Sequence, residues 1–184
     1  MAQSRRVKSR SPRKPRPPLD TATLEALAFH YVGRYATTRA KLADYLRRKV
    51  SERGWDGEGS PPTAAIVERF AELKLVDDQA FASAKAASLM RRGYGERRLR
   101  QALHAAGIEE EDAEPAREEA REGALAAALK FAERRRIGPY AQARLERDAL
   151  QKAVAAMVRA GHPYDLVKKV VYASPGDIPD LDSV

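Results

Sequence analysis

Apolar residues recur along most of the chain with the spacing of one face of an α-helix. Asp20 stands in the position of a helix N-cap, where a carboxylate accepts free backbone N–H groups, and a run of apolar residues follows it at i, i+3, i+4, i+7, i+8 and i+11. These positions are Leu24, Leu27, Ala28, Tyr31, Val32 and Tyr35. No run alternates between apolar and polar residues for long enough to indicate a strand. The pattern predicts an all-α fold.

Glycine and proline divide the rest of the chain into further helical runs. Thr37 or Thr38, and later Asp77 or Asp78, are residue types that cap the helix that follows them. A short acidic helix is expected after the break at Gly107. The positions that end or begin a helix are, in chain order, Gly54, Ser60–Pro61, Gly93–Gly95, Gly107, Gly138–Pro139, Gly161 and Pro163.

Three of these glycines recur at a nearly constant period. Gly54, Gly107 and Gly161 each end a helix, and they are 53 and 54 residues apart. A period of this length, with three helices per unit, is typical of repeat proteins in which each unit buries its apolar face on its neighbours. We therefore expect three tandem three-helix repeats, resembling helix-turn-helix units, in an elongated and curved stack. The predicted divisions are a disordered basic tail at 1–20, repeats at 21–76, 77–114 and 115–172, and an acidic tail at 173–184.

The net charge of +8, from 34 lysines and arginines against 26 acidic residues, is concentrated at the N-terminus. Residues 1–18 hold seven basic residues, four prolines and no acid, which leaves 27 basic against 26 acidic residues elsewhere. With so few large apolar side chains the tail is predicted to be disordered, and it is either a solubilising arm or an electrostatic tether to nucleic acid. If the tail tethers the protein to a single strand, seven phosphate contacts would give a slope of log affinity against log salt concentration of roughly 5 in magnitude. The candidate contacts are Arg5, Arg6, Lys8, Arg10, Arg13, Lys14 and Arg16.

Residues that carry enzymatic or metal chemistry are missing or isolated. Without cysteine there is no disulfide, thiolate zinc site or cysteine nucleophile. His30, His104 and His162 lie in different repeats at no metal-ligand spacing, and the adjacent acids Asp77 and Asp78 are better explained as helix caps than as acid and base. We therefore expect no enzyme activity, no cofactor and no metal. No apolar run approaches 18 residues and the basic N-terminus lacks an apolar stretch, so we expect a cytoplasmic protein without a membrane partner.

Clustered basic residues are the remaining functional signal. One cluster surrounds Tyr94. Arginines in such a cluster bind phosphates, and the aromatic ring stacks on a base or on a partner side chain. The alternative interpretation is a solvated helix junction. Groups in the other repeats would extend it into a basic track if all face the concave side of the stack. The opposite charge is found at 109–122, which holds eight acids and two arginines. The candidate binding residues are Arg91, Arg92, Tyr94, Arg97, Arg98 and Arg100, with Arg34, Arg39, Lys41, Arg134, Arg135 and Arg136.

Residues 75–108 also carry a distinctive combination of motifs. LVDDQAFA at 75–82 is followed by RRGYGERRLRQAL at 91–103 and by Gly107–Ile108. This combination resembles the middle repeat of the RecX family of recombination regulators, L-x-D-D-x-x-F-A followed by R-R-G-x-G-x-R-R-I-R and G-I. Leu99 replaces the usual Ile, and Ala106 replaces a Lys, so one basic contact is missing. Pro and Glu of the family pattern are here Glu96 and Ala102.

The resemblance extends more weakly to the flanking repeats. RYATTRAKL at 34–42 and Arg48–Lys49 fit the first repeat, and RAGHPYDLV at 159–167 fits the third, so that roughly residues 22–172 are covered. The resemblance implies three tandem three-helix repeats and a non-enzymatic protein that lies in the groove of the RecA recombinase filament. Such a protein restrains ATP hydrolysis, strand exchange and repressor cleavage.

Under this hypothesis the arginine cluster around Tyr94 contacts the filament or its DNA. The implied partners are the RecA filament and single- or double-stranded DNA without sequence preference, and we expect a monomer. The alternative is a helix-turn-helix nucleic-acid-binding protein, because a three-helix unit with an arginine-rich second helix also fits a major groove. Against it, no unit has an Asn- or Gln-rich helix start to read bases.

Overall fold

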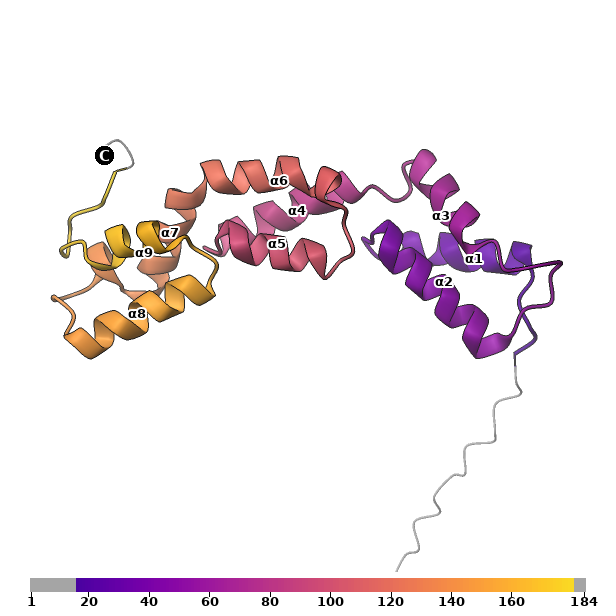
Figure 1. The fold of residues 1–184 in the computed structure, drawn as a ribbon, viewed down its shortest axis with the longest axis horizontal. Coiled ribbons are helices and arrows are strands. Elements are labelled where there is room, and N and C mark those ends of the chain that lie inside the picture. The colour runs from indigo at the N-terminus through magenta and orange to yellow at the C-terminus, as the bar shows by residue number, and fades with distance from the viewer. Residues whose placement is uncertain (1–15, 181–184) are drawn as a thin grey trace, which may run out of the picture.

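The computed structural model describes residues 16–180, and every regular element in that range is helical. Figure 1 shows an elongated molecule in which the helices form three groups arranged one after another. The β-type pairing within the described range is a single isolated bridge between Leu19 and Trp55. The all-α fold with three tandem three-helix repeats is therefore confirmed. Residues 1–15, which hold most of the predicted basic tail, and residues 181–184 lie outside the described range.

The first repeat consists of α1 (Thr21–Val32), α2 (Arg39–Arg53) and α3 (Thr63–Glu72). The predicted caps are present: Asp20 accepts the N–H of Thr23 at 2.8 Å, and the Thr38 hydroxyl accepts that of Lys41 at 3.2 Å. The buried side chains come from all three helices and include Leu24, Ala28, Leu42, Leu46, Ile66 and Phe70. Leu73 follows the end of α3 and is exposed.

Residues 17–20 were predicted to belong to the disordered tail, and the structure places them in the first repeat instead. Leu19 is fully buried in the first core, and its backbone exchanges hydrogen bonds with the Gly54 carbonyl and the Asp56 N–H. The Arg53 guanidinium donates to the Pro17 carbonyl at 2.8 and 2.9 Å. Burial of Leu19 and these hydrogen bonds together hold the segment against the first repeat, and local composition reveals neither.

The second repeat consists of α4 (Asp78–Arg91), α5 (Glu96–His104) and α6 (Glu110–Glu122). Its core is built from small residues on α4 and α6, such as Ala82, Ala86 and Ala116, together with Leu99 and Leu103 of α5. The acidic helix runs to Glu122 and packs along α4 and α5. The predicted division after residue 114 therefore falls inside α6, and the second repeat continues to the end of that helix.

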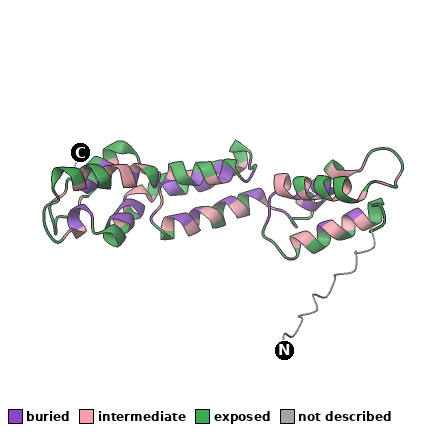
Figure 2. Cartoon of the chain, turned by 90° about the horizontal axis from the view of Figure 1, so that it is seen from below, coloured by how far each residue is buried: buried purple, intermediate pink, exposed green. Residues whose placement is uncertain are grey.

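The third repeat consists of α7 (Ala124–Arg135), the short 3-10 helix η1 (Gly138–Tyr140), α8 (Arg147–Arg159) and α9 (Tyr164–Val171). Its core includes Phe131, Met157, Val167, Val170 and Val171. Beyond α9, residues 173–180 contain no helix, and the Gly176 N–H donates to the Pro139 carbonyl at 2.8 Å. Figure 2 shows that the buried residues gather inside each of the three groups of helices. Each repeat thus has a core of its own.

The two joints between repeats have the same construction. In the first, the Thr38 hydroxyl at the start of α2 donates to the Ala106 carbonyl at 2.7 Å. In the second, the Gly95 N–H at the start of α5 donates to the Ala160 carbonyl at 3.0 Å. Each acceptor immediately precedes one of the periodic glycines, Gly107 or Gly161. The start of the second helix in one repeat therefore docks on the end of the second helix in the next.

Candidate functional site

The predicted arginine cluster lies at the joint between the second and third repeats. Arg91 and Arg92 end α4, the turn Gly93–Gly95 follows, and Arg97 and Arg98 stand in the first turn of α5. All four arginine side chains are exposed. The third repeat holds this turn in place. Gly93 and Gly95 are buried, and a Cβ on either glycine would collide with backbone atoms of the third repeat. The arginines are thus held on a rigid junction.

Tertiary packing adds basic residues of the third repeat to this cluster. The Arg134 guanidinium, near the end of α7, donates to the Arg92 carbonyl at 2.8 Å. The Arg92 guanidinium lies 5.1 Å from the centre of the Tyr94 ring, and Tyr94 packs against the cores of both repeats. Arg135 lies over Phe131 at 5.6 Å. Two groups that are 42 residues apart in sequence therefore form one surface, which we call the joint cluster: Arg91, Arg92, Tyr94, Arg97, Arg98, Arg100, Arg134, Arg135 and Arg136.

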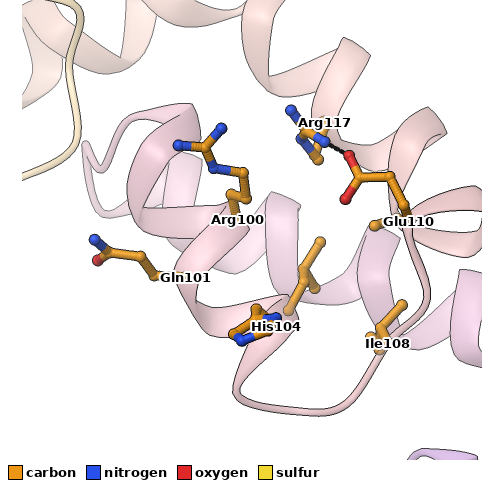
Figure 3. Close-up of a pocket in the computed structure, with 8 residues that line it drawn as sticks. Arg100, Gln101, His104, Ile108, Glu110 and Arg117 are labelled. Atoms are coloured by element: carbon orange, nitrogen blue, oxygen red, sulfur yellow. Dashed lines mark ion pairs between the residues drawn. The ribbon is translucent and has the colours of Figure 1, made fainter.

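Arg100 extends the joint cluster to a pocket of about 290 Å³ between α5 and α6. Figure 3 shows Arg100, Gln101 and His104 along one side of this pocket and Arg117 with Glu110 across it. The two arginines differ in their pairing. Arg117 is held by Glu110 and by Glu96 at 2.7 Å, whereas Arg100 has no acidic partner within the described residues. The pocket therefore presents one free and one neutralised cation.

None of the arginines in the joint cluster forms an ion pair with a described residue. An unpaired guanidinium carries its full charge and five donors toward a partner, and it can bind a carboxylate or a phosphate in bidentate fashion. The chemistry of these side chains therefore suits an anionic group.

Arg39, also predicted to be a binding residue, is instead committed to the first joint. Its backbone N–H donates to Asp78 at 3.0 Å, its Nε lies 3.4 Å from the same carboxylate, and its terminal nitrogen pairs with Asp112 of α6. Partial burial acts to lower the pKa of Arg39, but Asp112 and Asp78 outweigh it and raise the pKa. Arg39 thus links three helices and is not a free cation.

The other two basic residues predicted in the first repeat are also placed away from the joint cluster. Lys41 lies over the Phe81 ring of α4 at 4.9 Å, so its ammonium group contributes to the first joint. Arg34 lies just beyond α1, with its guanidinium 5.7 Å from the Tyr35 ring centre, in a separate groove of the first repeat. Within the tail, Arg16 is described and is exposed at that same groove. The tail residues from Arg5 to Lys14 lie outside the described range.

Sequence reasoning missed the role of His162, which is buried in the second joint with 3% of its surface exposed. Its Nε2 is 3.0 Å from the Gly93 carbonyl, and its ring meets Phe131 edge to face. Nδ1 has no hydrogen-bond partner among residues 16–180, and burial lowers the pKa of His162 below its ordinary value. Its position directly after the periodic Gly161 could have indicated this burial, since Gly161 lies where the second and third repeats meet.

Residues 16–180 contain no group of three or more His, Cys, Asp or Glu side chains arranged to hold a metal ion. No helix in this range is long and apolar enough to cross a membrane.

Comparisons with known proteins agree with this architecture. The family model described as "RecX, second three-helix domain" matches residues 77–116. The regulatory protein RecX of Myxococcus xanthus (strain DK1622) is 32% identical over 179 residues, which cover 91% of this chain and 94% of that protein. The regulatory protein RecX of Agrobacterium fabrum (strain C58 / ATCC 33970) is 30% identical over 148 residues, covering 78% and 79%.

A solved structure shares the fold. The crystal structure of RecX from Lactobacillus salivarius superposes with a TM-score of 0.61 at 20% sequence identity, over 82% of this chain and 94% of that chain. A second RecX crystal structure gives a TM-score of 0.60 at 22% identity, over 82% of this chain and 72% of that one. At these identities the likeness concerns the fold.

Proposed function

This chain belongs to the RecX family of regulatory proteins, and we propose that it acts by binding the RecA recombinase filament and restraining its ATPase, strand-exchange and coprotease activities. The regulator needs no catalytic group of its own. A protein that binds one state of a filament more tightly than another shifts the population by its differential affinity. It therefore acts as a ligand of the recombinase, and the proposal places it in the cytoplasm as a monomer.

The observation that carries this proposal is the joint cluster. Its arginines have no acidic partner among the described residues, and they lie on a joint that is fixed by backbone hydrogen bonds between two repeats. Long flexible cations lose conformational freedom on binding, so a rigid support raises the affinity that each contact contributes. An elongated array of repeats also offers a surface long enough to span adjacent subunits of a polymer. DNA without sequence preference is a further proposed partner of this cationic surface.

The test is ATP hydrolysis by the RecA recombinase on single-stranded DNA at near-physiological salt. We expect inhibition by the full chain well below equimolar ratios and none by a peptide of residues 1–20. Replacing Arg97→Ala and Arg98→Ala together should raise the concentration for half-inhibition about tenfold or more, since a hydrogen bond to a charged group contributes about 1.5–3 kcal/mol. Neither side chain is buried, so the fold should be retained.

The matched control is Arg144→Ala with Arg147→Ala. These two arginines are also exposed and lack an acidic partner within the described range. Arg147 is the first residue of α8 and Arg144 lies just before it, whereas the joint is at the other end of this helix. The control should inhibit like the unmodified chain. If the full chain leaves hydrolysis unchanged up to equimolar ratio, the proposal fails. If both double variants lose inhibition equally, the joint cluster is not the contact surface.

A further inference from the structure

A second cationic surface lies in the first repeat, in a groove of about 490 Å³ between α1 and α2. Three tyrosines line it: Tyr31, Tyr35 and Tyr45. Five cationic side chains surround them: Arg16, Arg34, Arg48, Lys49 and Arg53. No carboxylate is among the described residues that line this groove.

The tyrosine rings form a continuous aromatic ladder. Tyr31 and Tyr45 stack with their ring centres 4.1 Å apart and their planes at 12°. Tyr35 follows at 5.4 Å from Tyr31, tilted by 50°, and it is the outermost ring with 52% of its surface exposed. About half of the Tyr35 surface is thus accessible to a partner, and the Arg34 guanidinium lies beside the ring, 5.7 Å from its centre. Tyr35 is therefore the accessible end of the ladder.

The cations are arranged around the ladder, and part of their charge is free. Arg48 and Lys49 lie 5.8 and 5.7 Å from the Tyr45 ring centre and share one acid, Glu52, at 3.7 and 2.5 Å. Arg34 lies beside Tyr35 and has no acidic partner within residues 16–180. Two of the five cations share Glu52, and none of the described residues that line the groove is acidic, so cationic side chains outnumber acids next to exposed aromatic surface.

The chain itself extends this charge. Arg16 stands at the groove, and the fifteen residues before it include six further cations and no acid. Since Arg53 holds the Pro17 carbonyl, the basic segment starts from a fixed point at the groove. Arg16, the last cation of this segment, therefore adds its charge to the groove.

We propose that this groove is a site for single-stranded nucleic acid. Arg34, Arg48 and Lys49 would contact backbone phosphates, and a base would stack on the exposed ring of Tyr35. Proteins that bind single strands without sequence preference combine these two elements, whereas a duplex keeps its base faces inside the stack. The site is separate from the joint cluster. The inference adds a DNA contact to the one proposed above for the joint cluster, and it does not depend on binding to the recombinase.

The first arm of the test measures fluorescence anisotropy of a labelled oligothymidylate with the full chain, without recombinase. Tyr35→Ala should weaken binding about 5- to 150-fold, because stacking of one base contributes about 1–3 kcal/mol. Tyr35→Phe keeps the ring and should bind like the unmodified chain. The matched control is Tyr164→Ala on α9, which removes a tyrosine that is 59% exposed and also has a lysine, Lys168, over its ring. It should leave the affinity unchanged.

The second arm separates stacking from charge. On an abasic strand of equal length, Tyr35→Ala should have no effect, while Arg34→Gln with Arg48→Gln should weaken binding to both strands. The same double variant should lower the slope of log affinity against log salt by about 1.4, at roughly 0.7 per phosphate contact. Circular dichroism of each variant checks that the exposed substitutions leave the helices intact.

Three results would overturn the inference. They are equal affinity for a duplex and a single strand, an unchanged affinity of Tyr35→Ala for oligothymidylate, and displacement of the strand by polyglutamate of equal charge, which would indicate an acidic protein segment as the ligand. The inference and the proposed function can fail separately. A chain that binds the strand through Tyr35 but leaves recombinase hydrolysis unchanged keeps the site and loses the regulatory proposal.

Discussion

Asp77 and Asp78 are neighbours in sequence but contact different parts of the molecule. Asp77 caps α4 by accepting the Ala80 N–H at 2.9 Å, and that backbone hydrogen bond lowers its pKa. Asp78 is 4% exposed and points to the preceding repeat, where it accepts two hydrogen bonds from Arg39. The expectation that both acids are helix caps is therefore right for Asp77 and wrong for Asp78. One residue organises a helix end, and the other organises a joint.

Removing the Asp78 carboxylate should destabilise the protein more than removing an exposed one. Asp78→Ala leaves the Arg39 N–H without its acceptor, and we expect a loss of about 1–3 kcal/mol in the free energy of unfolding. Asp44→Ala removes a carboxylate that pairs with Arg47 on the surface of α2, and it should change stability by less than about 0.5 kcal/mol. Urea unfolding measures both. Equal losses would show that the buried pairing contributes no more than a surface pair.

His162 gives the second joint a dependence on pH. Burial disfavours the charged imidazolium, so the folded pKa lies below the ordinary value of about 6.5. Between these two values the unfolded chain binds more protons than the folded one, and stability rises with pH. We therefore expect the free energy of unfolding to have its full value above pH 7. It should fall as the pH drops through 6.5, by at most about 1.4 kcal/mol per pH unit for one proton.

The measurement is urea unfolding between pH 7.5 and 5.5, a range in which carboxylates stay largely ionised. His162→Gln keeps an N–H donor near the Gly93 carbonyl and should flatten the pH dependence. His104→Gln removes an exposed histidine of α5 and should retain it. A slope that survives in His162→Gln would assign the pH dependence to another group.

At the scale of elements, the periodic glycines both end helices and seat the next repeat. Gly107 and Gly161 have positive φ angles of 70° and 97°, which suit the left-handed turn after a helix. A Cβ on Gly107 would collide with Ala40 of the preceding repeat, and one on Gly161 would lie 2.5 Å from the Arg98 nitrogen. The spacing read from sequence therefore reflects two constraints at once, one on the backbone and one on the contact between repeats.

Gly161→Ala should separate these two constraints when it is compared with Gly59→Ala. Gly59 also has a positive φ, 65°, but nothing lies within 4 Å of the added methyl group, so only backbone strain of about 1–2 kcal/mol is expected. Gly161→Ala adds a collision with backbone and should cost about 3 kcal/mol or more. Thermal and urea unfolding test the difference. Similar losses in both variants would mean that the second joint tolerates a side chain at this position.

At the scale of the whole molecule, three separate cores are linked by two similar joints, and the cationic surfaces lie at different places along the array. The joint cluster belongs to the second and third repeats, whereas the tyrosine-lined groove belongs to the first. Arg39 and Lys41 lie between them but are bound within the first joint. The predicted basic track along all three repeats is therefore interrupted in the first repeat.

The basic segment should contribute to nucleic-acid binding through charge alone. Deleting residues 1–15 removes six cations and keeps Pro17 and Leu19 in place, so we expect the salt slope for single-stranded DNA to fall by about 4. A truncation that also removed Leu19 would disturb the first core and confuse the result. Anisotropy titrations from 50 to 200 mM salt measure the slope. An unchanged slope would assign the segment to solubility and not to binding.

The sequence by itself determined the helices, their caps and the repeat. Apolar periodicity, capping residues and helix-ending glycines act within a few residues of chain, so their physical effect can be read locally, as at Asp20, Thr38 and Gly107. The motif at 75–108 likewise identified the family. Helix ends were less well determined, and the end of the second repeat was placed eight residues too early because α6 is stabilised by its packing on α4.

Only the tertiary structure decided which charges are free. Arg39 and Arg97 both stand at the start of the second helix of a repeat, yet Arg39 is neutralised by Asp78 and Asp112 while Arg97 is exposed without an acidic partner within residues 16–180. The same holds for Leu19, which is buried by residues that are distant in sequence, and for the groove in which Tyr35 meets Arg34 and Arg48. The physical reason is that pairing and burial depend on which segments meet in space, and that contact is not encoded in any local pattern.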